Sequence, residues 1–232
     1  MKHLLYCIFK EEAVALPQEW KGRVDLLHAH RLSVAFSRSE PVASPPPLKD
    51  LLEYERVVAW LGARRSVIPL RYGNVLDSEA AVVELLARRA EEFHELLAEL
   101  DGKTELGVRI LLNDVPIRTA FSKPASGASP GAAYLESVRK RFESEGWLNG
   151  AESRLVQRIR ESVRHLDAVI ASELRATPDG RLLSLYLLLP KENVDECRRS
   201  LAPFVEDPSL KVLISGPWPP YHSVASRGPA YA

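Results

Sequence analysis

Histidines are the first side chains in this 232-residue sequence whose type and spacing could do chemistry. His28 and His30 are two positions apart, so on a β-strand they would share one face, where two imidazoles could bind a metal ion. No third ligand or supporting carboxylate accompanies them, and His94 lies in an acidic stretch with equally little support. We therefore expect a half-exposed strand face at His28 and His30, and no metal site.

The two cysteines offer a second kind of chemistry. Cys7 and Cys197 lie far apart and form no C-x-x-C pair, so the sequence indicates neither a disulfide framework nor a thiolate zinc site. Cys7 lies in an apolar run, where nothing would lower the pKa of its thiol or supply a partnered base. Both cysteines are expected to be buried and reduced, and Cys7 is not expected to be a nucleophile.

Two further segments suggest anion binding at first sight. Residues 126–133, SGASPGAA, are rich in glycine but lack the G-x-x-x-x-G-K-[ST] spacing that cradles a phosphate, so we expect a hinge there. Arg64, Arg65 and Arg71 form a small basic cluster flanked by acidic residues, which is typical of a solvated rim. We therefore expect no catalytic residue, no cofactor-binding residue, no metal ligand and no cofactor, and the protein is not expected to be an enzyme.

The bulk composition excludes further classes of protein. Hydrophobic residues make up 46% and charged residues 27% of the chain, which is an ordinary globular balance. Lys plus Arg equals Asp plus Glu at 31 each, so no global positive field would attract nucleic acid. Charged residues interrupt every candidate for the roughly 18 apolar residues that cross a bilayer, so we expect no membrane partner and a cytoplasmic location. The near-zero net charge leaves self-association possible.

Hydrophobic periodicity organises the first half of the chain into an α+β unit. Two helical patterns are expected, one from Leu48 to about Arg65 and one from Asp77 to the stop at Gly102. The first helix is expected to use Leu48 and Leu52 among its apolar residues. Strands are expected at residues 3–9, 23–28, 31–38, 66–73 and 103–112. Pro69 indicates that the fourth of these strands lies at an edge of its sheet or ends there, and the last strand is expected to complete the unit.

The second half is expected to follow a linker at residues 119–130. Helical segments are expected at 131–146 and 151–166, forming a helical hairpin or short coiled coil. A strand hairpin then turns at Asp179 and Gly180, and a further helix and a last strand follow. The fold class is thus α+β with two domains: an elaborated ferredoxin-like domain over residues 1–118, and residues 131–232 with long helices, a small antiparallel sheet and a proline-rich C-terminal tail.

The tail contains the most unusual string, GPWPPY at residues 216–221. Prolines fix the backbone φ angle, so Trp218 and Tyr221 are held on a stiff segment and could pack on their own domain or offer aromatic anchors to a partner. We expect internal packing, with Trp218 covering the end of a sheet, and no regular helix after it. Replacing Trp218 by alanine would then cost about 3 to 5 kcal/mol in stability.

Four features of the sequence together resemble a known family. They are the opening hydrophobic strand with Leu5 and Tyr6, VIPLRYGNVL at 67–76, LDGKTELGVRI at 100–110, and SGPWPPY at 215–221. On these features the chain resembles the gas vesicle protein F/L family. Phenylalanine is as usual as tyrosine at the position of Tyr72, and HSV after the tyrosine replaces a more usual aromatic residue.

The resemblance implies a minor component of gas vesicles, located at the gas vesicle in the cytoplasm, with no catalytic residues or cofactors. Its implied partners are the small hydrophobic shell protein and other minor gas vesicle proteins, and its implied role is to support nucleation or formation of the vesicle. Two alternatives stay open. One is a small-ligand enzyme built on a ferredoxin-like domain, and the other is a purely structural shell component that is never released.

Overall fold

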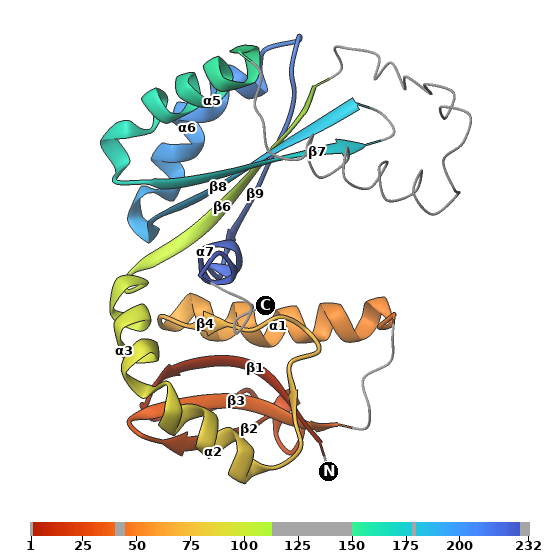
Figure 1. The fold of residues 1–232 in the computed structure, drawn as a ribbon, viewed down its shortest axis with the longest axis vertical. Coiled ribbons are helices and arrows are strands. Elements are labelled where there is room, and N and C mark those ends of the chain that lie inside the picture. Colours follow the sequence, from red (N-terminus) through yellow and green to blue (C-terminus); the bar gives the residue numbers. More distant parts are fainter. Residues whose placement is uncertain (1, 40–44, 113–149, 178–179, 228–232) are drawn as a thin grey trace, which may run out of the picture. The chain divides into compact units, whose positions relative to one another are not determined.

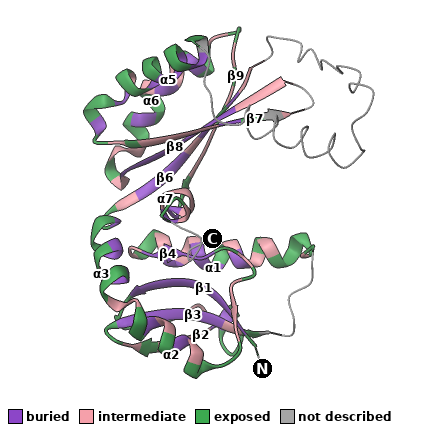
Figure 2. Ribbon diagram, in the orientation of Figure 1, coloured by how far each residue is buried: buried purple, intermediate pink, exposed green. Residues whose placement is uncertain are grey.

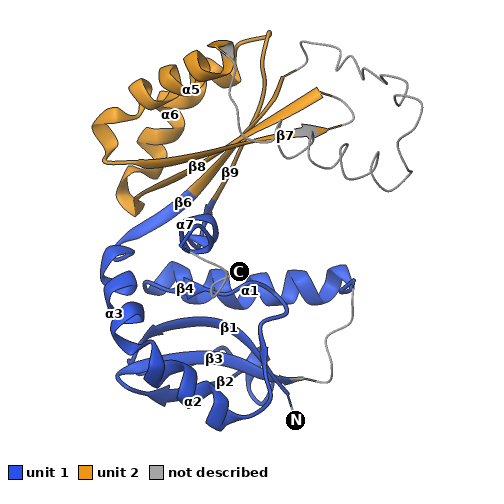
Figure 3. Cartoon of the chain, viewed as in Figure 1, with its two compact units in different colours: residues 1–105, 217–232 blue, residues 106–216 orange. Residues whose placement is uncertain are grey.

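The computed structural model describes residues 2–39, 45–112, 150–177 and 180–227, which form a mixture of helices and antiparallel sheets (Figure 1). The chain divides into two compact units (Figure 3). Unit 1 comprises Met1–Glu105 and Pro217–Ala232, and unit 2 comprises Leu106–Gly216. The expected linker at 119–130 and the expected helix at 131–146 lie outside the described residues.

Unit 1 is built on a five-stranded sheet whose long first strand is central. The strand order is β2-β3-β1-β4, and β5 also pairs with β1. The strands are β1 (Lys2–Lys10), β2 (Asp25–Ala29), β3 (Leu32–Ser39), β4 (Ile68–Pro69) and β5 (Val75–Leu76). Every residue of β1 from His3 to Phe9 is buried (Figure 2), as expected of a strand that is covered on both faces. Pro69 lies in the edge strand β4, which confirms the expectation from the sequence.

The helices of unit 1 before Glu105 include the expected one from Leu48, although not every residue expected in its packed face is buried. They are η1 (Gln18–Trp20), α1 (Leu48–Arg64), α2 (Glu79–Arg88) and α3 (Ala90–Glu99). The buried residues of α1 begin at Tyr54 and recur at helical spacing through Val57, Val58 and Leu61. Leu48 and Leu52, which were expected on this buried face, are 69% and 57% exposed. They project from the first turns of α1 at a different angle around the helix axis.

The single helix expected between Asp77 and Gly102 is two helices, with a break at Arg89. The backbone there has φ −124° and ψ 19°, outside the helical region. The Arg89 guanidinium bonds both carboxylate oxygens of Glu92 at 2.7 Å and lies 4.9 Å from the Phe93 ring centre. The buried residues Val82, Leu86, Phe93, Leu96 and Leu97 stay in phase across the break, so periodicity alone could not reveal it.

A strained two-residue turn joins β2 to β3. His30 and Arg31 have φ angles of 54° and 62°, although neither is glycine. Both central residues of a two-residue hairpin turn of this kind need positive φ, which favours Asn-Gly. The His94 ring lies against the turn, with Nε2 3.1 Å from the His30 carbonyl oxygen.

Replacing this turn by Asn-Gly is expected to stabilise the protein. The double variant His30→Asn/Arg31→Gly should raise the free energy of unfolding by about 1 kcal/mol, because the left-handed region is cheaper for these residues. Ala29→Gly, in the adjoining strand β2, is the control and should lower stability. Chemical denaturation measures the free energy of unfolding of both variants. A double variant less stable than the parent would show that the turn is not strained.

Unit 2 contains most of a four-stranded sheet with the order β7-β8-β6-β9. Its strands are β6 (Lys103–Leu112), β7 (Val169–Thr177), β8 (Gly180–Pro190) and β9 (Lys211–Trp218). Its helices are α5 (Gly150–Ser162), η2 (Arg164–Leu166), η3 (Lys191–Asn193) and α6 (Val194–Val205). The predicted hairpin is confirmed, because β7 and β8 pair antiparallel up to Thr177 and Gly180.

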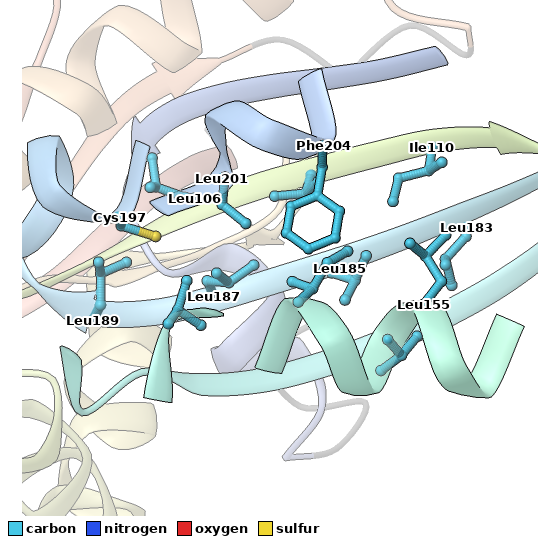
Figure 4. Packing of buried hydrophobic residues seen from close by; sticks show 14 of the residues in the cluster. Leu106, Ile110, Leu155, Leu183, Leu185, Leu187, Leu189, Cys197, Leu201 and Phe204 are labelled. Atoms are coloured by element: carbon cyan, nitrogen blue, oxygen red, sulfur yellow. The ribbon is translucent and has the colours of Figure 1, made fainter. Parts of the chain in front are cut away.

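The core of unit 2 lies between this sheet and its two long helices (Figure 4). Alternate leucines of β8 point to one face, as the two-residue period of a strand requires. All four of these leucines are fully buried: Leu183, Leu185, Leu187 and Leu189. They pack with Leu155 of α5, and with Cys197, Leu201 and Phe204 of α6. Helix α5 therefore uses its apolar face inside unit 2.

Two expectations about chain organisation need correction. The strand 103–112 was expected to complete the first unit, but β6 lies between β8 and β9 in the second sheet. Alternation identifies a strand without naming its neighbours, which is why the sequence could not assign it. The tail after Trp218 was expected to contain no regular helix, but α7 (Tyr221–Ala225) forms there. The proline run ends at Pro220, so every residue of α7 keeps its N–H group.

Candidate functional site

The C-terminal turn, residues 215–227, is the candidate site. It begins where β9 runs beside β6, and two side chains fix this pairing. The Thr104 hydroxyl donates to the Trp218 carbonyl oxygen at 2.9 Å, and the Ser215 hydroxyl donates to the Gly107 carbonyl oxygen at 3.4 Å. Gly216 lies between them at φ 103°, a conformation that favours glycine and redirects the strand.

The prolines of the turn, rather than its tryptophan, pack into unit 1. Pro219 and Pro220 are buried, and Pro219 lies against Gly62 of α1. A Cβ atom on Gly62 would lie 3.2 Å from Pro219 Cγ and 3.4 Å from Val67 Cγ2. Glycine at position 62 therefore permits a close approach of the turn to the helix, and a larger residue would push it away.

Glu105 holds the next part of the turn, the start of α7, in place. Its side chain is buried, with only 4% of the residue exposed, and its carboxylate accepts from the first residues of α7. The His222 backbone N–H donates to Oε1 at 3.2 Å, and the Ser223 N–H and hydroxyl donate to Oε2 at 2.9 and 2.8 Å. The carboxylate thus satisfies N–H groups at the start of α7 that have no partner within the helix.

Two partly buried polar side chains, Tyr221 of the turn and Glu55 of α1, lie close together. The Tyr221 hydroxyl lies beside the Glu55 carboxylate. Burial raises the pKa of Tyr221, and the Glu55 charge raises it further. Burial also raises the pKa of Glu55, while the Tyr221 hydroxyl lowers it. The tyrosine therefore stays protonated in the neutral pH range.

Trp218 is 45% exposed, so the expectation that its ring covers the end of a sheet is wrong. Its backbone is fixed by Thr104, and the following prolines are buried, but its side chain reaches solvent. The two prolines after Trp218 are buried, and Pro219 lies against Gly62, so the following residues and not the Trp218 side chain pack inward. A large aromatic side chain is thus presented on a rigid segment.

Three separated sequence features meet around this turn. Thr104 and Glu105 come from the segment 100–110, and Leu70 of the segment 67–76 accepts a hydrogen bond from Tyr54 of α1 at 2.8 Å through its carbonyl oxygen. Helix α7 also contacts β4. Glu105 is the residue of the candidate site that sequence reasoning missed. Its signal was an acidic residue within an alternating strand.

The histidines singled out in the sequence lie at or beside the turn between β2 and β3. His28 Nδ1 lies 2.8 Å from the Ser33 hydroxyl, while His30 is exposed at the hairpin turn. Within the residues that the structure describes, no group of three or more His, Cys, Asp or Glu side chains could hold a metal ion. His94 instead contacts the backbone of the hairpin turn.

Both cysteines are buried and unpaired in disulfides, as expected. Burial raises the pKa of the Cys7 thiol, an effect that the Arg65 charge only partly opposes. Burial likewise raises the pKa of Cys197 to about 11. Both thiols are therefore protonated at neutral pH, where a nucleophile would need the thiolate.

The basic cluster does not gather into one anion site. Arg64 stacks over the Trp60 ring with 4.0 Å between the guanidinium carbon and the ring centre. Arg65 pairs with Glu12 at 3.4 Å. The glycine-rich segment 126–133 lies outside the described residues. Among the helices of the described ranges, none is long and apolar enough to cross a bilayer.

Comparison with known proteins identifies the family of this chain. A family model described as "Gas vesicle synthesis protein GvpL/GvpF" matches residues 2–225. The chain belongs to this family. Gas vesicle protein F of Streptomyces sp. (strain CB03234) is 24% identical over 242 residues, covering 97% of this chain and all of that protein. Gas vesicle protein L of the same strain is 25% identical over 176 residues, covering 72% of this chain and 66% of that protein.

Solved structures of family members share the fold. The crystal structure of GvpF from Anabaena sp. PCC7120 aligns with a TM-score of 0.68 at 17% identity, covering 96% of this chain and 98% of that one. The structure of GvpF from Microcystis aeruginosa aligns with a TM-score of 0.67 at 17% identity, covering 95% and 97%. The family resemblance inferred from the sequence is therefore confirmed, and the chain is a gas vesicle protein of the GvpF/GvpL type.

Proposed function

We propose that this gas vesicle protein acts by binding: it holds the hydrophobic shell subunit and supports nucleation or formation of the vesicle without catalysing a reaction. Membership of the GvpL/GvpF family supports a role at the gas vesicle, in contact with shell protein and other minor gas vesicle proteins. Buried, protonated thiols and arginines held in local contacts agree with a binding role.

The main support for the proposal is that the Trp218 side chain is exposed while the backbone around it is held in place. Large aromatic side chains contribute most strongly to protein interfaces when a partner desolvates them. Binding costs less when the contributing segment is already ordered, and the turn is ordered by Thr104, Glu105 and the buried Pro219. An exposed indole held in this way matches the apolar surface expected of a shell subunit before it joins the growing wall.

We also infer that both units are versions of the ferredoxin-like arrangement. In each sheet the first strand lies between the third and the fourth, in the orders β2-β3-β1-β4 and β7-β8-β6-β9. Unit 2 carries α5 before β7 and α6 before β9, whereas unit 1 has only η1 between β1 and β2. The first unit is thus a reduced form of the arrangement that the sequence suggested for it.

The direct experiment is a titration of the full-length protein with purified shell subunit. We expect saturable binding that persists at high salt, because an apolar contact is not screened as surface charge pairs are. Binding that disappears at high salt would contradict an apolar contact through Trp218. No binding at all would contradict the proposed function.

A further inference from the structure

A pocket of about 480 Å³ lies within unit 1, apart from the C-terminal turn. Its volume falls within the usual range for ligand sites, roughly 300 to 1,000 Å³. Residues from β1, β2, β3 and α1, and from the segments before β2 and after β4, line it. Three tyrosines, two arginines and three carboxylates form its chemically distinctive wall.

The tyrosines form a fixed aromatic floor. Tyr6 and Tyr54 stack with 4.8 Å between ring centres, and Tyr72 meets Tyr54 edge-on at 5.3 Å. The Tyr54 hydroxyl lies 2.8 to 3.2 Å from three carbonyl oxygens, those of Leu5, Tyr6 and Leu70. The floor is therefore held in place before any ligand arrives, and its aromatic faces carry the negative potential that attracts cations.

The arginines of the pocket are already engaged by carboxylates. Arg38 donates to Asp25 at 2.7 Å and also to Glu79 at 3.1 Å, and Arg23 is paired with Glu53. An incoming phosphate or carboxylate would have to displace these acidic partners. The pocket is consequently poorly suited to anions, although two guanidinium groups line it.

The lining charges leave one carboxylate in excess, and that carboxylate is Asp50. Arg23 and Arg38 balance Glu53 and Asp25, while no ion pair within the described ranges joins Asp50 to a basic side chain. Asp50 lies near Tyr72: burial raises the pKa of the Tyr72 hydroxyl, and the negative charge of Asp50 raises it further. Asp50 and Tyr72 thus line the same pocket, and no basic side chain of the described ranges pairs with Asp50.

We propose that this pocket binds the cationic side chain, a lysine or an arginine, of a protein partner in the gas vesicle. A guanidinium or ammonium group placed between Asp50 and the Tyr72 ring would gain both an ion pair and a cation–π contact. The paired arginines and carboxylates that line the pocket would form hydrogen bonds with the polar backbone beside that side chain. The assignment to a gas vesicle partner rests on the proposed function, whereas the preference for a cation rests on the pocket alone.

The cation preference is tested on the full-length protein with Nα-acetyl-arginine methylamide. The neutral isostere Nα-acetyl-citrulline methylamide serves as the ligand control, and NMR or tyrosine fluorescence reports binding. We expect saturable binding of the arginine compound and at least fivefold weaker binding of the citrulline compound, from the size of exposed charge contacts. Equal binding of the two compounds, or no binding of either, would overturn the proposal.

Variants locate the binding to this pocket. Asp50→Asn should weaken binding of the arginine compound about fivefold. The control Asp77→Asn, which removes a carboxylate with an 89% exposed side chain outside the pocket, should have no effect. Tyr72→Leu should weaken binding by a similar factor of about five, and Tyr72→Phe should retain it because the ring remains. Equal effects of Asp50→Asn and Asp77→Asn would contradict the site.

Competition with the shell subunit separates this inference from the proposed function. An excess of the arginine compound should lower the apparent affinity of the shell subunit for the full-length protein. Shell binding that is unaffected by the compound would overturn the assignment of that partner to the pocket while leaving the proposed function intact. Failure of the shell subunit to bind would overturn the proposed function, and the titration with the arginine compound would still decide the cation preference.

Discussion

Glu105→Ala is expected to destabilise unit 1 by about 3 kcal/mol. The buried carboxylate accepts three hydrogen bonds from His222 and Ser223, and hydrogen bonds to a charged group contribute about 1.5 to 3 kcal/mol each when lost singly. Their loss removes the carboxylate that accepts from two N–H groups at the start of α7, and water replaces this acceptor only in part. Chemical denaturation measures the change, and limited proteolysis within α7 should accelerate.

The matched control for this variant is Glu99→Ala. Glu99 is also an acidic residue that contacts the turn, through Arg227, but its side chain is 47% exposed. Exposed ion pairs contribute little, so the control should cost less than about 1 kcal/mol. Glu105→Gln should fall between the two, because the amide keeps one acceptor and brings an N–H group against the other donor. Equal losses for Glu105→Ala and Glu99→Ala would contradict the anchoring role of Glu105.

Leu185→Ala is expected to cost unit 2 a similar amount, about 3 kcal/mol. Leu185 is fully buried at the centre of the cluster in Figure 4, between β8 and the two long helices. Removing its side chain loses the transfer free energy of the buried methyl and methylene groups and leaves a cavity, which together cost about 2 to 5 kcal/mol.

The control for the core variant is Leu213→Ala in β9. Leu213 is 60% exposed, so its truncation should change the free energy of unfolding by no more than about 0.5 kcal/mol. Circular dichroism during denaturation follows both variants. A small loss for Leu185→Ala would mean that the helices do not pack tightly on this face of the sheet.

Local sequence patterns predicted helices and strands well where one hydrophobic period is enough to identify the element. The hairpin of β7 and β8 followed from alternation and from the turn residue Gly180, and α1 followed from helical spacing. The break at Arg89 could not be predicted, because the buried residues on either side stay in phase. Sheet membership was equally hidden: the alternation of β6 is compatible with either sheet, and only the fold assigns its neighbours.

The candidate site shows the same division between local and long-range information. The stiffness of the GPWPPY string could be predicted, because proline restricts φ wherever it lies. The outward direction of the Trp218 side chain could not be predicted, since it depends on the close approach of Pro219 to Gly62. Glu105 and the pocket beside Asp50 also depend on residues brought together from distant segments, such as the contact between Glu105 and Ser223.

The central claim is that Trp218 binds the shell subunit. The most direct test compares shell-subunit affinity and denaturation midpoint for the wild-type protein, Trp218→Ala and the exposed-residue control Leu213→Ala. Because Trp218 is exposed, its truncation should leave the midpoint nearly unchanged while weakening binding at least about tenfold, as for an interface hot spot. Leu213→Ala should change neither quantity. Wild-type affinity in Trp218→Ala, or weaker binding accompanied by an equally lowered midpoint, would contradict the claim.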